Sequence, residues 1–316
     1  MAKKPRFAII GVGPVGGIFG GHMASAGHYV VLVDVLKSHL DAISERGLII
    51  TGVTEMKVKC ERIAYDISQL PNFPEVDIII ISTKASVMSS ILPQIEKVAK
   101  PGTNFISLQN GLGNEDFIAE TFGRDNVMRI VVNYAGNRVA DGEIWMSFFN
   151  KPNYIGVLTP KAEPLARQVA EMMTEAKLDT EFTSDIKRHE WEKTILNAAL
   201  SPICALTGKT MKEMMDFEPT RSLVEETLRE GIEVAAADGV TFDEGFFEHG
   251  VQYLRKAGYH KTSMHVDIEH RSPTEIDWLN GKIVERGLKH GLETPYNTTL
   301  TALIKGLERR SEAPEQ

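Results

Sequence analysis

The stretch AIIGVGPVGG, residues 8–17, limits the possible folds more than any other part of this 316-residue chain. It places Gly11, Gly13 and Gly16 in a G-x-G-x-x-G spacing, after the apolar run RFAII and before a helix predicted to begin near Val15. In that context Gly11 permits a tight turn, Gly13 lets a pyrophosphate approach the backbone, and Gly16 lets helix and strand pack closely. The free N–H groups of a helix N-terminus attract phosphate. The stretch therefore predicts a dinucleotide-binding loop, formed by Gly11, Val12, Gly13, Pro14, Val15 and Gly16.

An acidic residue, Asp34, lies 18 residues after Gly16, near the position expected of a ribose-binding acid. The run YVVLVD (29–34) predicts a second strand that ends at Asp34, with Val35 next. In dinucleotide-binding sheets an acid at this place binds the ribose hydroxyls of NAD, whereas a nearby arginine accommodates the 2′-phosphate of NADP. The alternative is a glycine-rich turn in another α/β fold. The succession of strand, loop, helix, strand and acid favours the dinucleotide site.

The first half of the chain alternates predicted strands and helices. Three further strands are predicted, at 76–82, 103–109 and 126–135, with helices between them at about 86–99 and 114–121. This alternation predicts a parallel sheet wrapped by helices. Two β-rich runs within 142–158 flank Asn150–Asn153 and predict a hairpin or an antiparallel addition.

From about Ser184 the strand signal disappears. Helical patterns take its place, at 185–200, 219–238, 242–256, 272–290 and 295–309. We therefore predict two domains, a dinucleotide-binding α/β domain at 1–183 and a helical domain at 184–316. The polar tail ERRSEAPEQ is expected to fray.

Composition excludes several classes of protein. The net charge is −8 and the basic residues are scattered, so we expect no nucleic-acid partner. The longest apolar run, VDIIIIS, is far shorter than the roughly 20 residues of a membrane span, and no signal peptide is visible. Cys60 and Cys204 match no metal or redox spacing and predict reduced thiols in a cytoplasmic protein. The spacing of His265, Asp267 and His270 fits neither H-E-x-x-H nor a zinc finger, so we expect no metal.

Four polar residues stand out among apolar neighbours. Lys193 and Asn197 in WEKTILNA lie four apart, on one face of a predicted helix. Lys84 and Asn110 each follow a buried strand, where the carboxyl ends of a parallel sheet face a ligand. Taken singly, each has an ordinary explanation: a lysine snorkelling to water, a helix entry, a turn residue.

Glu275 lies in SPTEID, where Ser272 and Pro273 can cap and begin a helix. An acid in the first turn of a helix is also favourable for electrostatic reasons alone.

In order, GVGPVGG, STKA, LQNGLG, WEKTILNA and TSMHVDIEHRSPTEIDWLNG resemble the ketopantoate reductase (2-dehydropantoate 2-reductase) family, from about residue 6 to 305. The resemblance implies an α/β Rossmann domain followed by an all-α domain like the C-terminal domain of 6-phosphogluconate dehydrogenase. It implies reduction of a small anionic 2-keto acid by NADP(H), most simply ketopantoate to pantoate in the pathway to pantothenate and coenzyme A.

The resemblance also implies roles for individual residues. Lys193 matches the catalytic lysine, and Glu275 an acid that contacts the cofactor and supports catalysis. Asn110 matches a residue that touches both nicotinamide ribose and substrate. Further matches are substrate-binding positions at Asn197, Ser201 and Ser263, and cofactor-binding positions at Lys84, Ala135 and the glycine loop. A lysine ammonium at such a site can protonate the carbonyl oxygen and stabilise its developing charge.

The sequence departs from the family pattern at four positions. Val35 stands where an arginine usually meets the 2′-phosphate, so Asp34 and Val35 favour NAD(H) although the family implies NADP(H). Ser201 and Met211 replace asparagines, and Val266 replaces a frequent glutamine. These changes leave open a related 2-hydroxyacid dehydrogenase with another substrate.

A non-catalytic dinucleotide-sensing protein is a further alternative, and the retained Lys193, Asn197 and Glu275 disfavour it. A helical second domain is compatible with a homodimer.

Overall fold

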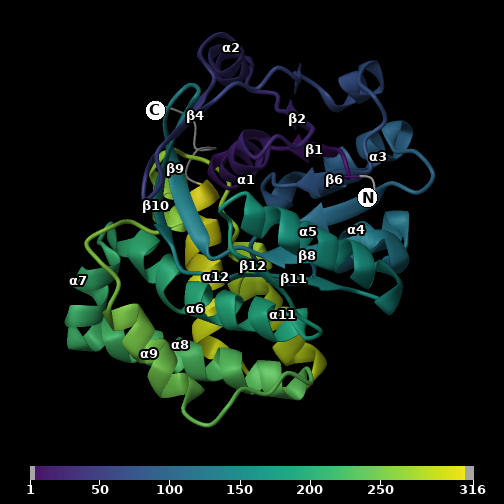
Figure 1. The fold of residues 1–316 in the computed structure, drawn as a ribbon. Helices are drawn as coiled ribbons and strands as arrows, with labels where there is room; N and C mark the ends of the chain where they lie inside the picture. The colour runs from purple at the N-terminus through teal and green to yellow at the C-terminus, as the bar shows by residue number, and fades with distance from the viewer. Residues whose placement is uncertain (1–3, 310–316) are drawn as a thin grey trace. The chain divides into compact units, whose positions relative to one another are not determined.

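The computed structural model describes residues 4–309, which form two compact units (Figure 1). The first unit contains the chain up to Gln109 together with Gly113–Ile186. The second contains the turn Asn110–Leu112 and the chain from Lys187 onward. The division falls after Ile186, against residue 183 in the prediction. Nothing in the sequence pattern indicated that Asn110–Leu112 joins the helical unit.

The main sheet of the first unit has eight strands within residues 4–309, in the order β12-β11-β8-β7-β6-β1-β2-β5. Their bounds are β1 Phe7–Ile10, β2 Val30–Val33, β5 Ile63–Ala64, β6 Ile78–Ile81, β7 Asn104–Ser107, β8 Val127–Val131, β11 Asn153–Val157 and β12 Thr180–Phe182. Strand β1 pairs in parallel with β2 on one side and β6 on the other, and β7 and β8 continue the parallel order. The carboxyl ends of β1, β2 and β6 therefore share one edge of the sheet, as the alternating pattern predicts.

A second, four-stranded sheet in the first unit was not predicted. Its order is β4-β3-β10-β9, with β3 at Leu48–Gly52, β4 at Met56–Val58, β9 at Tyr134–Ala140 and β10 at Glu143–Phe149. The predicted strand 126–135 is thus two strands, β8 and the start of β9, which belong to different sheets.

The predicted hairpin across Asn150–Asn153 is wrong. Strand β10 pairs with β9, and β11 pairs with β8 in the main sheet, so the two β-rich runs never pair with each other. Strand β10 is antiparallel to β9, and β11 is antiparallel to β8, as the alternative prediction of an antiparallel addition states.

Helix α1 (Pro14–Ser25) lies between the two sheets, and its paired glycines explain how. A Cβ at Gly20 would lie 2.8 Å from the side chains of Ile9 and Leu32 in the main sheet. A Cβ at Gly21 would lie 2.7 Å from Ile50 Cδ1 in the second sheet. In Figure 1 the long arrows of β9 and β10 run beside α1. The helix is buried on opposite faces because glycine on each face lets a sheet approach its backbone.

The remaining helices of the first unit include short 3₁₀ turns at the sheet edges. They are α2 Lys37–Arg46, η1 Ile67–Asn72, η2 Ala85–Val87, α3 Met88–Val98, α4 Asn114–Phe122, η3 Arg124–Asn126, η4 Pro160–Ala162 and α5 Glu163–Glu175.

Within its described residues the second unit contains helices joined by turns and loops, and no strand. Its elements are α6 Ile186–Thr207, α7 Met211–Asp216, α8 Glu218–Ala237, α9 Phe246–Arg255, α10 Ser263–Glu269, η5 Ile276–Trp278, α11 Asn280–Lys289 and α12 Pro295–Glu308. A separate apolar core, from Leu112 to Ile304 along the chain, holds these helices together. The predicted fold class, an α/β Rossmann unit followed by an all-α unit, is confirmed.

One predicted helix begins later than expected. The segment from Ser272 to Glu275 is not helical, because its backbone groups have other partners: Thr274 N–H donates to Glu308 Oε1 (2.7 Å), and Ile276 N–H donates to Thr274 Oγ1 (3.3 Å). Glu275 therefore precedes a 3₁₀ turn rather than lying inside a helix begun by Ser272 and Pro273.

Among residues 4–309, no helix is long and apolar enough to cross a bilayer. Most of the tail predicted to fray, from residue 310 on, lies outside the described residues.

Candidate active site

The glycine loop connects β1 to α1 as predicted, and each of its glycines has a different environment. Gly11 has a positive φ of 94°, and a Cβ there would lie 2.8 Å from the backbone nitrogen of Thr83. A Cβ on Gly16 would overlap the carbonyl oxygen of Gly11. At Gly13, in contrast, no heavy atom of the described chain lies within 4 Å of the Cβ position. The loop is closed toward the sheet and open at Gly13, where a ligand can approach the backbone.

The first turn of α1 offers hydrogen-bond donors next to buried hydroxyls. Gly13 is the N-cap, Pro14 occupies the first turn, and no side chain of residues 4–309 caps the helix. The hydroxyls of Ser82 and Thr83, beside the loop, are buried without a partner among the described residues. Uncapped N–H groups together with unpartnered hydroxyls fit an anionic group such as a pyrophosphate.

Asp34 reaches the loop directly. Its Oδ2 accepts a hydrogen bond from Val12 N–H (2.7 Å), and its Oδ1 accepts one from Leu36 N–H (2.9 Å). A carboxylate has about four acceptor positions, so ribose hydroxyls can still donate to it. Val35, 84% exposed, provides no cation at the place where the family usually has an arginine.

Two other predicted cofactor positions lie on neighbouring elements of this unit. Lys84 is half-buried and directly precedes η2, after β6. Ala135 lies on β9, and its carbonyl oxygen accepts a hydrogen bond from the hydroxyl of Ser147 (3.1 Å). Tyr134, which the sequence analysis missed, donates its hydroxyl to the carbonyl oxygen of Val15 (3.2 Å) and so connects β9 to α1.

The structure brings Asn110 and Glu275 together within the second unit. Asn110 Nδ2 donates to Glu275 Oε2 at 3.0 Å, and Glu275 is 8% exposed. The neighbouring Leu112 N–H donates to the carbonyl of Trp278 (3.1 Å), which fixes the turn to η5. The two residues are far apart in sequence, and only the fold could show that they pair.

Gln109, directly before Asn110, ends a chain of buried hydrogen bonds along the main sheet. Arg129 Nη1 donates to Ser107 Oγ (2.7 Å), and Ser107 Oγ donates to Gln109 Oε1 (3.2 Å). Gln109 Nε2 in turn donates to the carbonyl of Thr83 (3.1 Å). These bonds fix the chain where it leaves β7, immediately before Asn110.

Lys193, Asn197 and Ser201 share one face of α6. They lie at successive helical turns, with Lys193 and Asn197 half-buried and Ser201 buried. The hydroxyl of Thr262, the N-cap of α10, approaches the carbonyl oxygen of Ser201 (3.5 Å). Ser263, the next residue, is exposed at the start of α10.

Helix α6 contains Pro202, which has no N–H, so the carbonyl of Ala198 lacks its usual partner within the helix. The side chain of Asn280 supplies it: Nδ2 donates to the Ala198 carbonyl at 3.0 Å and to Asn297 Oδ1 at 2.9 Å. Asn297 Nδ2 donates to Glu230 Oε2 (2.7 Å). This buried chain of amides holds α6 one residue from Asn197. The helix was predicted to end at residue 200, before Pro202, so the sequence analysis did not anticipate this support.

Within the described residues no three His, Cys, Asp or Glu side chains gather as a metal site. His265, considered above for a metal, instead lies 3.3 Å from Glu269. Both cysteines are buried and unbonded, and burial raises the pKa of Cys60 to about 11 and that of Cys204 to about 12. Neither thiol is a nucleophile at neutral pH.

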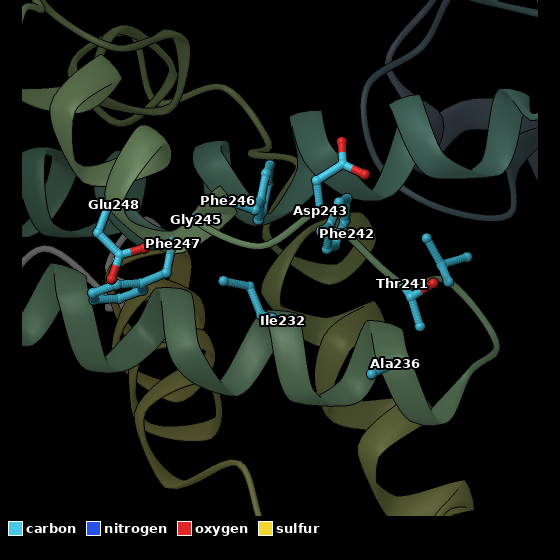
Figure 2. Close-up of a pocket in the computed structure, with 10 residues that line it drawn as sticks. Ile232, Ala236, Thr241, Phe242, Asp243, Gly245, Phe246, Phe247 and Glu248 are labelled. Carbon is cyan, nitrogen blue, oxygen red and sulfur yellow. The ribbon is translucent and has the colours of Figure 1, made fainter.

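A hollow of about 300 Å³ lies in the helical unit, between α8 and the segment that leads into α9. Figure 2 shows its lining, with Ile232 on α8 facing the rings of Phe242 and Phe246. Those two rings are stacked, with centroids 3.9 Å apart. None of the predicted site residues lines this hollow, so it is not the candidate active site.

A Rossmann unit with this loop, followed by a helical unit bearing the Lys193 face and the Asn110–Glu275 pair, defines the class of two-unit, dinucleotide-dependent oxidoreductases. Residues 7–160 match the family described as "Ketopantoate reductase PanE/ApbA", and residues 185–308 match "Ketopantoate reductase PanE/ApbA C terminal". The chain belongs to the ketopantoate reductase family.

Individual relatives agree with this assignment. A 2-dehydropantoate 2-reductase of Pyrococcus abyssi is 33% identical over 303 residues, covering 96% of this chain and 98% of the relative. A 2-dehydropantoate 2-reductase of Geobacter metallireducens is similar in structure, with a TM-score of 0.89 and 25% identity over 95% of this chain and 99% of the other. A D-mandelate dehydrogenase, solved with NADH and anilino(oxo)acetate, has a TM-score of 0.88 and 26% identity over 98% of this chain and 100% of the other.

Proposed function

We propose that this protein reduces a 2-keto acid with a nicotinamide dinucleotide, most simply ketopantoate to pantoate. The observation that supports it best is the α6 face, where Lys193 and Asn197 lie one turn apart in a chain of the ketopantoate reductase family. Such a face combines a proton donor with a hydrogen-bonding amide.

The reaction needs a hydride at the carbonyl carbon and a proton at the carbonyl oxygen. The bound dinucleotide supplies the hydride. The Lys193 ammonium donates the proton to the oxygen, and its positive charge attracts the anionic substrate. Asn197 orients the substrate by hydrogen bonds, and Ser201 and Ser263 are the further substrate contacts. Glu275 holds Asn110 in place through the 3.0 Å hydrogen bond.

The test is a spectrophotometric screen of 2-keto acids with NADH and with NADPH, on the wild type and on Lys193→Ala. Ketopantoate should be reduced by the wild type and much more slowly by the variant. Tight dinucleotide binding with no turnover of any keto acid would instead support the sensing protein.

A second candidate is a 2-hydroxyacid dehydrogenase for apolar or aromatic substrates. Ser201 and Met211 replace family asparagines, and a D-mandelate dehydrogenase is among the structural relatives. This function predicts comparable kcat/KM values for phenylglyoxylate and ketopantoate. A strong preference for ketopantoate would instead support the reduction of ketopantoate to pantoate.

For the cofactor we propose NAD(H) over NADP(H), because Asp34 would repel a 2′-phosphate and Val35 cannot neutralise it. Lys37 and Lys84 are the cations that could reverse this preference. A homodimer, a cytoplasmic location and the absence of nucleic-acid partners remain predictions.

A further inference from the structure

The backbone of Val12, inside the glycine loop, is held on both sides by side chains, through its N–H in the Gly11–Val12 peptide and its carbonyl in the Val12–Gly13 peptide. Asp34 accepts a hydrogen bond from its N–H side (2.7 Å). At the other end, the carbonyl oxygen of Val12 lies 3.1 Å from Nε2 of His39. Val12 and His39 are each 1% exposed, so water does not compete for these bonds.

The other ring nitrogen of His39 fixes its tautomer. The backbone N–H of Gly142, in the turn between β9 and β10, donates to His39 Nδ1 at 2.9 Å. Because Gly142 N–H can only donate, Nδ1 carries no proton and the proton of the neutral ring is on Nε2. His39 therefore donates to the Val12 carbonyl, and it connects the glycine loop to the β9–β10 turn.

Helix α2 holds that turn at two further places. Arg46 Nη2 donates to the carbonyl of Asp141 (2.9 Å), and Arg46 Nη1 lies 3.3 Å from Glu143 Oε1. A Cβ on Gly142 would lie 3.1 Å from the Cβ of Ala42 on α2. These contacts hold the β9–β10 turn against α2, and His39 connects this turn to the carbonyl of Val12.

The hydrogen bond from Gly142 N–H to His39 requires a neutral ring, and the surroundings of His39 shift its pKa. Burial lowers the pKa of His39, and Arg138 on β9 lowers it further, while Asp34, the bond to Val12 and Asp141 raise it. The ring is therefore neutral at pH 7. Protonation would place a hydrogen on Nδ1 facing the N–H of Gly142, and two donors cannot form a hydrogen bond.

We propose that His39 is a positioning residue for the dinucleotide loop: it sets the orientation of the Val12 carbonyl, and so of the Val12–Gly13 peptide, and its protonation weakens dinucleotide binding. This inference rests on the proposed function, since it assumes that the loop binds a dinucleotide.

The test is calorimetric binding of NAD⁺, with NADP⁺ in parallel, to the full chain at pH 8 and pH 5.5. Two amide variants separate the two bonds of the ring, because glutamine can reach the Val12 carbonyl and asparagine cannot. His39→Gln should bind within about threefold of the wild type at pH 8, and His39→Asn about tenfold more weakly, the loss expected for one buried hydrogen bond.

The wild type should lose affinity on acidification, by less than the roughly tenfold that a histidine of unshifted pKa would give between pH 8 and pH 5.5, because the pKa of His39 is lowered. His39→Gln should lose less than the wild type. The matched control is His28→Gln. His28 is a buried histidine of the same unit whose ring nitrogens have no hydrogen-bond partner within residues 4–309, and the pH dependence of this variant should equal that of the wild type.

Equal affinities and equal pH profiles for the wild type and both His39 variants would overturn the inference and leave the proposed function intact. A wild type that binds neither dinucleotide would overturn both. If the variants do not fold, ¹⁵N-histidine NMR of the wild type decides. The inference requires the Nε2–H tautomer at pH 8, and a His39 titration that matches the acid loss of binding. An Nδ1–H tautomer, or a titration unrelated to binding, would contradict it.

Discussion

Lys193 is the residue on which the proposed chemistry depends most. It is half-buried on α6, whereas Lys187 is exposed on the same helix and serves as a matched control. Lys193→Ala should lower kcat by at least about 100-fold, as expected for loss of a positioned general acid, with a normal circular dichroism spectrum. Lys187→Ala should leave kcat unchanged. Near-normal turnover by a folded Lys193→Ala protein would remove this lysine from the mechanism.

Asp34 and Val35 carry the prediction on cofactor choice. The wild type should have a higher kcat/KM with NADH than with NADPH, measured at one saturating substrate concentration. Asp34→Ala/Val35→Arg should move the preference toward NADPH, because it removes a like charge and adds a cation near the 2′-phosphate.

The structure adds a control for this experiment. Asp34 also holds Val12 N–H, so the double variant should weaken binding of both dinucleotides to some extent. Val35→Arg alone retains that bond and isolates the effect of the cation. A wild type that clearly prefers NADPH would show that Lys37 or Lys84 outweighs Asp34.

At the scale of elements, α6 and α1 each contain residues that are unfavourable in an isolated helix. Helix α6 contains a proline and depends on Asn280 from another helix to satisfy the Ala198 carbonyl. Helix α1 lies between two sheets, and glycine at Gly20 and Gly21 lets each of them approach. In both cases a residue that disfavours an isolated helix is accommodated by its tertiary surroundings.

The dependence of α6 on Asn280 can be measured by a double-mutant cycle. Asn280→Ala should cost about 1–3 kcal/mol in the free energy of unfolding, because it leaves the buried Ala198 carbonyl without a donor. In a Pro202→Ala background the new N–H of residue 202 supplies that donor, so the same change should cost about 1 kcal/mol less. Urea denaturation followed by circular dichroism gives the four values. Strictly additive costs would show that Asn280 acts only through Asn297.

At the scale of the whole molecule, the sequence predicted those features that depend on local order. The loop between β1 and α1, the position of Asp34 after β2, and the shared face of Lys193 and Asn197 all follow from spacing along one or two elements. The second sheet did not, because β3 and β10 pair across a long stretch of chain and neither carries a signal for the other.

Long-range hydrogen bonds account for the remaining differences. The helix expected to begin at Ser272 is delayed because Glu308, on α12, takes the N–H of Thr274. His39 reads as an ordinary polar residue of a surface helix, and only the fold shows both of its ring nitrogens engaged. The pairing of Asn110 with Glu275 is likewise a product of tertiary structure.

The α/β unit buries His22, His28 and His39, and burial is the first cause that lowers the pKa of each. In the unfolded chain these histidines titrate near 6.5, and in the folded protein at lower pH. Between those values the unfolded state binds more protons, so acid favours unfolding. Stability should therefore be fully present above about pH 6.5 and should be lost as the pH falls through the folded-state pKa values.

Differential scanning calorimetry between pH 8 and pH 5, at constant ionic strength, tests this expectation. Carboxylates with lowered pKa values, such as Asp66 and Asp125, lose their contribution to stability only below pH 5, so they do not affect the change in Tm between pH 8 and pH 5. His28 is the best residue to replace, because neither of its ring nitrogens has a partner within residues 4–309. His28→Phe should unfold with a Tm that falls less steeply on acidification than that of the wild type. A wild-type Tm that stays constant from pH 8 to pH 5 would mean that the buried rings accept protons in the folded protein as readily as in the unfolded chain.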